Sequence, residues 1–195
     1  MTQAADTIQP TDADHMRYMQ AALREAKKAA DCGDVPVGAV VVRAGRIIGR
    51  GHNLREQRQD AVLHAEIVAI RQASRKLRSW RLDNCTLYVT LEPCLMCSGA
   101  ILQSRISQLI FGATDAKAGA CCSVVRSFDL PLHHTVNWQQ GVMADECSRI
   151  LRDFFKNKRI AKKQFGTRGQ RKAAALDKYQ ERLQLASNTE PQKRD

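Results

Sequence analysis

The sequence has few aromatic residues and no long apolar run, and both absences exclude classes of protein. Aromatic residues make up 5% of the 195 residues, although 44% of the chain is hydrophobic. No apolar stretch approaches the roughly 20 residues that a membrane-spanning helix needs. The 11 glycines and 5 prolines are too few for a collagen-like chain, and the apolar content is too high for a wholly disordered one. We therefore expect one globular domain with an ordinary core and no membrane-spanning helix.

The first residues also lack the apolar core of a secretion signal. Met1 to Asp14 is polar and acidic, so we expect a cytoplasmic protein. The chain contains 7 cysteines. An odd number of cysteines without a secretion signal indicates reduced thiols or metal ligands, not a disulfide framework.

Positive charge is concentrated at the C-terminal end. Residues 156–195 contain 12 basic and 4 acidic residues, a net charge of +8, whereas residues 1–155 contain 19 basic and 16 acidic residues, a net charge of +3. A basic segment favours an anionic partner such as nucleic acid or an anionic membrane surface. A solvated, solubilising tail explains the same charge equally well.

The hydrophobic pattern alternates between helical and extended segments. We expect strands where β-branched and other apolar residues run together, and helices where apolar residues recur every three or four positions. The predicted helices are 16–30, 64–77, 94–103 and 142–155, with a marginal charged helix at 172–185; the predicted strands are 37–42, 46–49, 86–91, 109–111 and 134–138. This order favours a layered α/β domain with an antiparallel hairpin at the start and a parallel pair around 94–103.

Two short motifs carry the chemistry, and each is weak evidence by itself. They are His64-Ala65-Glu66 and Pro93-Cys94-Leu95-Met96-Cys97. A lone Cys-x-x-Cys can be a redox pair or half of a structural zinc site, and most His-x-Glu triplets lie on helix surfaces. Here both motifs open a predicted helix, where the positive end of the helix dipole favours thiolates. Together they predict a metal held between two helix N-termini.

The ligand types suggest which metal would bind. One imidazole and two thiolates, from His64, Cys94 and Cys97, are zinc-type ligands. Three protein ligands leave a fourth position for water, as in catalytic zinc sites, and Glu66 would then act as the general acid and base. A fourth thiolate from Cys85, Cys121 or Cys122 would instead close the site and make it structural.

His-x-Glu followed by Pro-Cys-x-x-Cys is the signature of zinc nucleobase deaminases. The chain further resembles the bacterial tRNA-specific adenosine deaminase family, within the zinc-dependent cytidine and deoxycytidylate deaminase superfamily. The resemblance extends over about residues 14–160, and its matching segments are 35–39, 51–53, 64–66, 90–100, 104–106, 111–113, 115–117 and 144–147. The family pattern is broken at Leu63, Thr114 and Cys121-Cys122, which puts loop geometry and RNA contacts in question more than the zinc chemistry.

The resemblance implies a three-layer α/β/α cytidine-deaminase-like fold with a mixed central sheet of about five strands. The deaminase domain would span residues 13–160, between a flexible leader (1–12) and a basic tail (161–195) that is disordered or marginally helical. The implied reaction is hydrolytic deamination of adenosine to inosine at wobble position 34 of a tRNA anticodon. It would use one Zn²⁺ per subunit, bound by His64, Cys94 and Cys97, with Glu66 as proton shuttle, in a homodimer.

The resemblance also implies residues that bind the substrate. Asn53 would hydrogen-bond the flipped base, an apolar set would line its pocket, and two further sets would contact the RNA. The apolar set is Val35, Pro36, Val37 and Leu91; the RNA sets are Asp115 with Lys117 and Phe155 with Lys158 and Arg159. Ordinary structural roles stay open for all of them: a turn asparagine, core packing, a solvated loop and a solvated helix face.

Two other functions remain open at this point. The zinc signature is shared with enzymes that deaminate a free base or nucleotide such as cytosine or guanine. A closed, four-ligand zinc would indicate a non-catalytic RNA-binding module. Separately, the tail could add salt-dependent, sequence-independent affinity for RNA.

Overall fold

A computed structural model describes residues 11–165 of the chain. The chain divides into two compact units, Met1–Phe154 and Phe155–Asp195, and each is considered by itself. Most of the predicted leader, most of the predicted tail and the predicted helix at 172–185 lie outside the described residues. Within residues 11–165, no helix is both long enough and apolar enough to cross a membrane.

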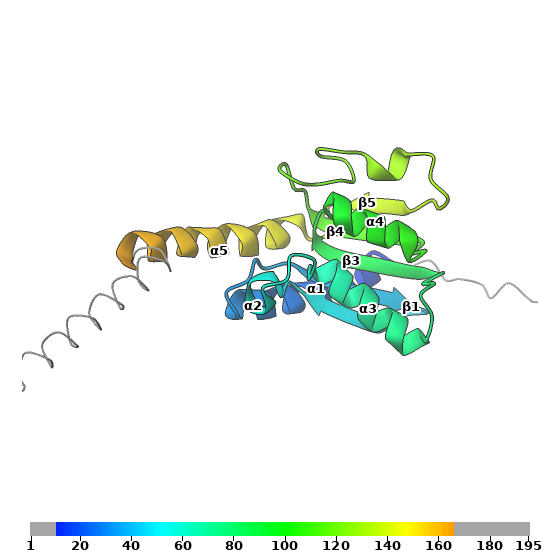
Figure 1. Ribbon diagram of the computed structural model, residues 1–195, viewed down its shortest axis with the longest axis horizontal. Coiled ribbons are helices and arrows are strands. Elements are labelled where there is room, and N and C mark those ends of the chain that lie inside the picture. Colours follow the sequence, from blue (N-terminus) through cyan, green and yellow to red (C-terminus); the bar gives the residue numbers. More distant parts are fainter. Residues whose placement is uncertain (1–10, 166–195) are drawn as a thin grey trace, which may run out of the picture. The chain divides into compact units, whose positions relative to one another are not determined.

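One mixed sheet of five strands organises the first unit, in the order β2-β1-β3-β4-β5 (Figure 1). β1 (Gly38–Arg43) runs antiparallel to β2 (Arg46–His52) and to β3 (Cys85–Leu91), whereas β3, β4 (Gln108–Ala113) and β5 (Asn137–Gln140) are mutually parallel. The predicted hairpin and the predicted parallel pair are both confirmed.

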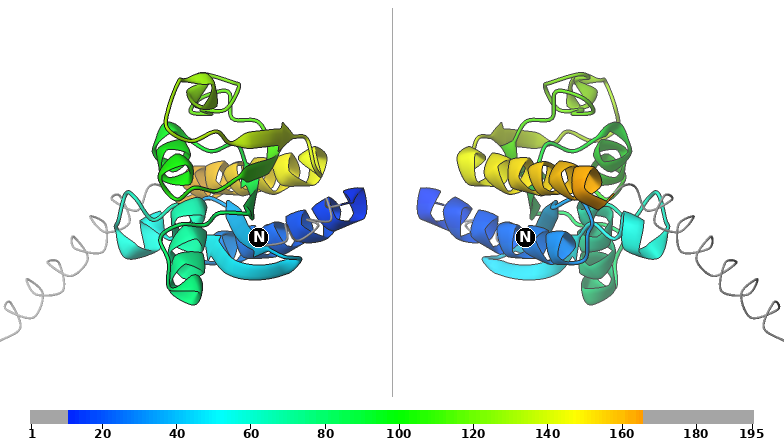
Figure 2. Two further views of the ribbon diagram at one scale, coloured as in Figure 1. Left: turned by 90° about the vertical axis from the view of Figure 1, so that its right-hand side faces the viewer. Right: turned by 90° about the vertical axis from the view of Figure 1, so that its left-hand side faces the viewer.

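Helices cover both faces of this sheet (Figure 2). α3 (Ala65–Leu77) and α4 (Leu95–Gln103) lie on one face, and α1 (Asp12–Asp31) lies on the other. Alternate residues of β3 serve the two layers, because successive side chains of a strand point to opposite faces. Leu87 and Val89 belong to the core cluster beneath α3 and α4, whereas Tyr88 packs with Tyr18 and Met19 of α1. The predicted three-layer α/β/α fold is therefore confirmed.

Three smaller elements complete the described chain. They are α2 (Arg55–Arg58), a 3₁₀ turn (Ser127–Asp129) and α5 (Ala144–Phe165), which crosses the boundary between the two units. At the start of α5, Cys147 is fully buried in the cluster that contains the α1 side chains.

The boundaries of some elements differ from those predicted. α1 begins at Asp12, inside the predicted leader, because Thr11 and Asp14 form a capping box that satisfies backbone N–H groups at the helix start. β5 begins at Asn137 rather than at His134, whose ring nitrogen hydrogen-bonds the carbonyl of Ile106 at 2.7 Å. α5 continues beyond residue 155, where the apolar pattern weakens.

Helix and sheet approach each other closely at Gly38. A Cβ atom on Gly38 would lie 2.1 Å from the carbonyl oxygen of Ala22 and 2.3 Å from the backbone nitrogen of Ala26. Both of these atoms belong to the backbone of α1, so they cannot rotate away. The absence of a side chain at Gly38 therefore sets the distance between α1 and β1.

We predict that Gly38→Ala lowers the free energy of unfolding by about 2–3 kcal/mol, because a methyl group forced into a packed contact must displace the helix. Gly99→Ala is the matched control, since nothing lies within 4 Å of the added methyl group on α4. The control should raise stability by up to about 1 kcal/mol, as alanine favours a helix over glycine. Urea denaturation measures both; equal stability of the two variants would contradict this packing.

Candidate metal centre and active site

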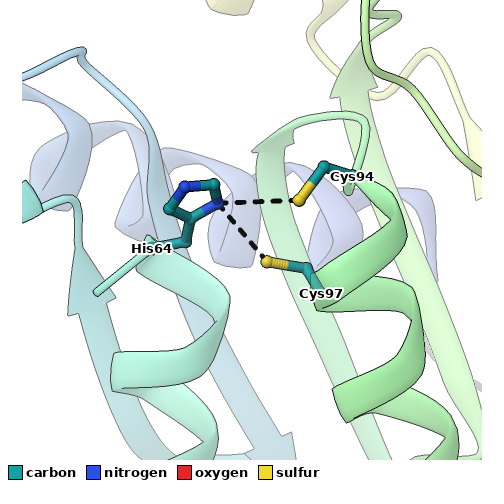
Figure 3. Close-up of side chains that lie close together, drawn as sticks. All are labelled: His64, Cys94 and Cys97. Carbon is teal, nitrogen blue, oxygen red and sulfur yellow. Dashed lines mark hydrogen bonds between the residues drawn. The ribbon is translucent and has the colours of Figure 1, made fainter. Parts of the chain in front are cut away.

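Two helices on the same face of the sheet begin side by side, and the three proposed metal ligands sit at these beginnings (Figure 3). His64 is the N-cap of α3, Cys94 is the N-cap of α4, and Cys97 lies in the first turn of α4. The Nδ1 atom of His64 is 3.7 Å from the Sγ atom of Cys94 and 3.6 Å from the Sγ atom of Cys97. The structure thus brings together residues that lie 30 and 33 positions apart.

The local chain geometry leaves these side chains available as ligands. Neither His64 nor Cys94 uses its side chain to cap its own helix. The N–H group of Ala65, the first residue of α3, instead donates to Oδ1 of Asn53 at 3.0 Å. Asn53 follows β2 directly, so the end of that strand fixes where α3 begins and where His64 points.

The cluster fits a tetrahedral zinc ion. At ordinary Zn–N and Zn–S bond lengths, a tetrahedral ion places the nitrogen and sulfur atoms about 3.6 Å apart, which agrees with both observed distances. Within residues 11–165, these three side chains form the one group of three or more such residues whose donor atoms all lie within 4.8 Å of one another. Three protein side chains in the described part of the chain can therefore bind the ion, as in catalytic zinc sites.

The cysteines that could have closed the site lie elsewhere. Cys85 is buried at the start of β3, and Cys121 is buried in the core cluster beneath α3 and α4. The thiol of Cys122 donates to Oε1 of Gln140 at 3.2 Å. None of the three joins the metal group found among the described residues.

The two cysteines of the cluster have pKa values shifted in opposite directions. A hydrogen bond from the Cys97 thiol, reinforced by His64, lowers the pKa of Cys94 to about 4 in spite of partial burial. The hydrogen bond with Cys94, together with burial, raises the pKa of Cys97 far above its usual range, and Cys94 also raises the pKa of His64. A thiol with the pKa of Cys94 is ionised at neutral pH, and binding of a metal cation would remove the proton of Cys97 as well.

Glu66 lies beside the ligands without belonging to the group that they form. It is the second residue of α3 and is 4% exposed. Burial raises the pKa of its carboxyl group, although its own backbone N–H and the nearby His64 oppose the shift. The Cys97 side chain also lowers the pKa of this carboxyl group, so Glu66 lies close to the cluster. A buried carboxyl group with a raised pKa next to a metal position is suited to exchanging protons.

Three of the residues predicted to form the base pocket directly precede β1, and the fourth, Leu91, is the last residue of β3. The carbonyl of Val37 accepts the N–H of Asn53 at 3.2 Å, so these two residues are neighbours. Pro36 and Val37 are buried, and Val35 and Leu91 are partly buried against the core. Val35, Val37 and Leu91 therefore also pack in or against the core.

The residues predicted to contact RNA fall into two groups. Asp115 and Lys117 lie in the loop after β4, where Oδ1 of Asp115 accepts the N–H of Lys117 at 2.9 Å and Lys117 is exposed. Phe155, Lys158 and Arg159 lie on α5 within the second unit and are exposed. The metal cluster belongs to the first unit.

Sequence reasoning missed three buried carboxylates, Glu25, Asp34 and Glu92, and the last two accept hydrogen bonds from backbone N–H groups. Asp34 accepts the N–H groups of Glu56 and Gln57 and so fixes the start of α2. Glu92 is 3% exposed; burial would raise the pKa of its carboxyl group, but hydrogen bonds led by the Ser123 hydroxyl and the Cys122 N–H lower it to about 2. An acidic residue directly between an apolar strand and Pro93 was the available signal for Glu92.

We predict that iodoacetamide modifies Cys94 of chelator-treated protein at pH 6, because a thiol with a pKa of about 4 is ionised there. Cys85 and Cys147 should stay unmodified, since burial raises their pKa values to about 11 and about 12. Peptide mass spectrometry identifies the labelled residue.

Two controls belong to this labelling experiment. Added zinc should protect Cys94, and Cys97→Ala should move its labelling to higher pH by removing the hydrogen bond that stabilises the thiolate. Labelling of Cys94 that is insensitive to zinc would contradict a metal site here.

Comparison with known proteins shows the family to which the chain belongs. The sequence profile of the MafB19-like deaminases matches residues 13–159. The chain is 44% identical over 147 residues to the tRNA-specific adenosine deaminase of Streptococcus pyogenes serotype M18, covering 75% of this chain and 92% of that protein. It is 46% identical over 155 residues to the chloroplastic tRNA(adenine(34)) deaminase of Arabidopsis thaliana, covering 71% of this chain but only 12% of that much longer protein.

A solved structure agrees with both sequence comparisons. It comes from studies of A-to-I editing by tRNA:A34 deaminases at the wobble position of transfer RNA, with 44% identity and a TM-score of 0.68. The match covers 69% of this chain and 99% of the solved chain. The profile, the near-complete bacterial relative and the shared fold confirm what the motifs predicted: this chain belongs to the deaminase family that contains the tRNA-specific adenosine deaminases.

Proposed function

We propose that this protein is a zinc-dependent deaminase that converts adenosine to inosine at wobble position 34 of a tRNA anticodon. The observation that carries the proposal is the three-ligand cluster at two helix N-termini with the buried carboxyl group of Glu66 against it. The names and activities of the relatives support the choice of substrate.

In the proposed reaction, three residues bind the metal and a fourth transfers protons. His64, Cys94 and Cys97 would hold the zinc ion, which lowers the pKa of a bound water to about 7 and so supplies hydroxide at neutral pH. Glu66 would accept a proton from the attacking water and deliver it to the adenine ring nitrogen. It would then assist departure of the exocyclic amine, so that adenosine and water yield inosine and ammonia.

The base must leave the RNA stack to reach this site. Oδ1 of Asn53 is committed to the N–H of Ala65, which leaves the amide NH₂ group to donate a hydrogen bond to the base. Val35, Pro36, Val37 and Leu91 would supply its apolar surroundings. Asp115 and Lys117 would contact the flanking nucleotides, and Phe155 with Lys158 and Arg159 would stack on an unpaired base and bind phosphate.

The organisation of the whole chain follows from the same proposal. Residues 13–160 would form the catalytic domain between a leader (1–12) and a basic tail (161–195) that adds sequence-independent affinity for RNA. The active form would be a cytoplasmic homodimer with one Zn²⁺ per subunit and tRNA as its partner.

The proposed activity is tested by incubating the purified protein with an anticodon stem-loop that carries adenosine at position 34, and in parallel with free cytidine, adenosine and guanine. We expect inosine at position 34 by sequencing, with one ammonia released per inosine. Ammonia released from a free base or nucleoside, with no inosine in the RNA, would instead establish a free-base or nucleoside deaminase.

We predict that Glu66→Ala lowers kcat by about a thousandfold, because a positioned general acid and base contributes rate factors of this order. Zinc content and melting temperature should stay close to those of the wild-type protein, since Glu66 is not a proposed ligand. Glu146→Ala, which removes an exposed glutamate from the first turn of α5, should leave kcat unchanged. An active Glu66→Ala protein would refute the proton-shuttle role.

A further inference from the structure

The carboxylate of Glu92 lies at the centre of a loop that folds around it. Its Oε1 atom accepts backbone N–H groups from three consecutive residues: Cys121 at 3.0 Å, Cys122 at 2.8 Å and Ser123 at 3.0 Å. Its Oε2 atom accepts the N–H of Asp115 at 3.0 Å and the hydroxyl of Ser123. Five donors therefore converge on one side chain that is 3% exposed.

The backbone next to Glu92 holds the same loop. The N–H of Glu92 donates to the carbonyl of Ala113 at 2.8 Å, and the N–H of Ala120 donates to the carbonyl of Pro93 at 2.8 Å. Gly119 forms an isolated β-bridge with Cys94, a proposed metal ligand. Residues 113–123 are thus attached at several points to the turn that carries Cys94.

A carboxylate is the side chain that this arrangement requires. Only an ionised carboxylate accepts hydrogen bonds at both oxygens while contributing no donor of its own. Hydrogen bonds to a charged acceptor are also stronger than neutral ones, which offsets the cost of burying the charge.

The contact with Asp115 extends the network to the protein surface. Glu92 fixes the N–H of Asp115, and Oδ1 of Asp115 in turn accepts the N–H groups of Lys117 at 2.9 Å and Ala118 at 3.3 Å. Lys117 is exposed. A continuous series of hydrogen bonds therefore joins the segment that precedes Cys94 to the segment that presents Lys117.

We propose that Glu92 is a positioning residue that holds the Asp115–Lys117 segment at a fixed place relative to the metal cluster, so that RNA bound by this segment delivers its base to the cluster. The inference rests on the proposed function, because it takes RNA to be what the segment binds. The hydrogen bonds of the Glu92 carboxylate run to residues 115 and 121–123 and not to the ligand side chains, so we take Glu92 to act through Asp115.

Glu92→Gln should remove the hydrogen bond that Oε2 of Glu92 accepts from the N–H of Asp115. A glutamine that keeps its oxygen toward the three N–H groups of residues 121–123 must turn its NH₂ group toward Asp115. The Ser123 hydroxyl can rotate to accept a hydrogen bond from that group, whereas the N–H of Asp115 loses its acceptor. The substitution should therefore release the Asp115 end of the loop and leave the 121–123 end in place.

The test measures steady-state kinetics on the anticodon stem-loop with zinc-loaded protein. For Glu92→Gln we expect KM to rise about tenfold, the effect of losing one hydrogen bond that organises the binding segment. We expect kcat to change by less than about twofold and zinc content to stay at one per chain, because the cluster itself is untouched.

Gly119→Ala is a second variant that should disturb the contact between Glu92 and Asp115. Its Cβ atom would lie 2.3 Å from Oε2 of Glu92 and 2.6 Å from the backbone oxygen of Asp115. The methyl group must therefore disturb the contact between these two residues, and the same rise in KM is expected. Gly99→Ala is the matched control, because its methyl group meets nothing within 4 Å, and its KM should equal that of the wild-type protein.

A double-mutant cycle separates positioning from general loss of structure. If Glu92 acts through Asp115, Asp115→Ala should raise KM by itself, and adding Glu92→Gln should raise it little further. Hydrogen–deuterium exchange gives a readout without turnover: Glu92→Gln should speed exchange in residues 113–119 and leave α3 and α4 protected.

Each outcome decides between the two proposals. Wild-type KM in Glu92→Gln, or fully multiplicative effects in the double variant, would overturn the positioning role. A fall in kcat with loss of zinc would assign Glu92 to the metal site instead. Absence of inosine with the wild-type protein would refute the proposed function, whereas unchanged exchange at 113–119 would separately refute the link through Glu92.

Discussion

The side-by-side start of α3 and α4 on one face of the sheet is the constraint on which the site depends. α3 follows the hairpin strand β2 and the short helix α2, and α4 follows the end of the central strand β3. The N-termini of both helices point to the same region. Asn53 fixes the first residue of α3 through the N–H of Ala65. The metal distances, the position of Glu66 and the availability of Cys94 all follow from this arrangement.

Much of the fold and the centre of the site could be predicted from sequence, because both depend on local patterns. The strand at 86–91, the helix opened by Cys94 and the apolar strand at 109–111 each lie in one continuous segment, and the chain order then leaves few ways to pair them. His64, Glu66, Cys94 and Cys97 were predictable because a ligand at the start of a helix carries a recognisable residue type and spacing. The family resemblance then supplied the reaction.

The role of Glu92 could not be predicted, because its partners come from a distant segment. Its five donors lie 23 to 31 residues further along the chain, and four of them are backbone groups that leave no trace in residue type. Cys121 and Cys122, which depart from the family pattern, belong to the same loop. Glu92 binds their N–H groups, Cys121 fills the core, and the thiol of Cys122 binds Gln140, so neither needs to be a ligand.

The central claim is that three protein side chains hold a zinc ion and leave one coordination position open. X-ray absorption at the zinc edge measures this directly on the purified, zinc-loaded protein. We expect two sulfur neighbours at about 2.3 Å and two nitrogen or oxygen neighbours at about 2.0–2.1 Å, one from His64 and one from water. Cys94→Ser should remove one sulfur neighbour. Three sulfur neighbours in the wild-type protein would mean that another cysteine closes the site, and would contradict a catalytic zinc.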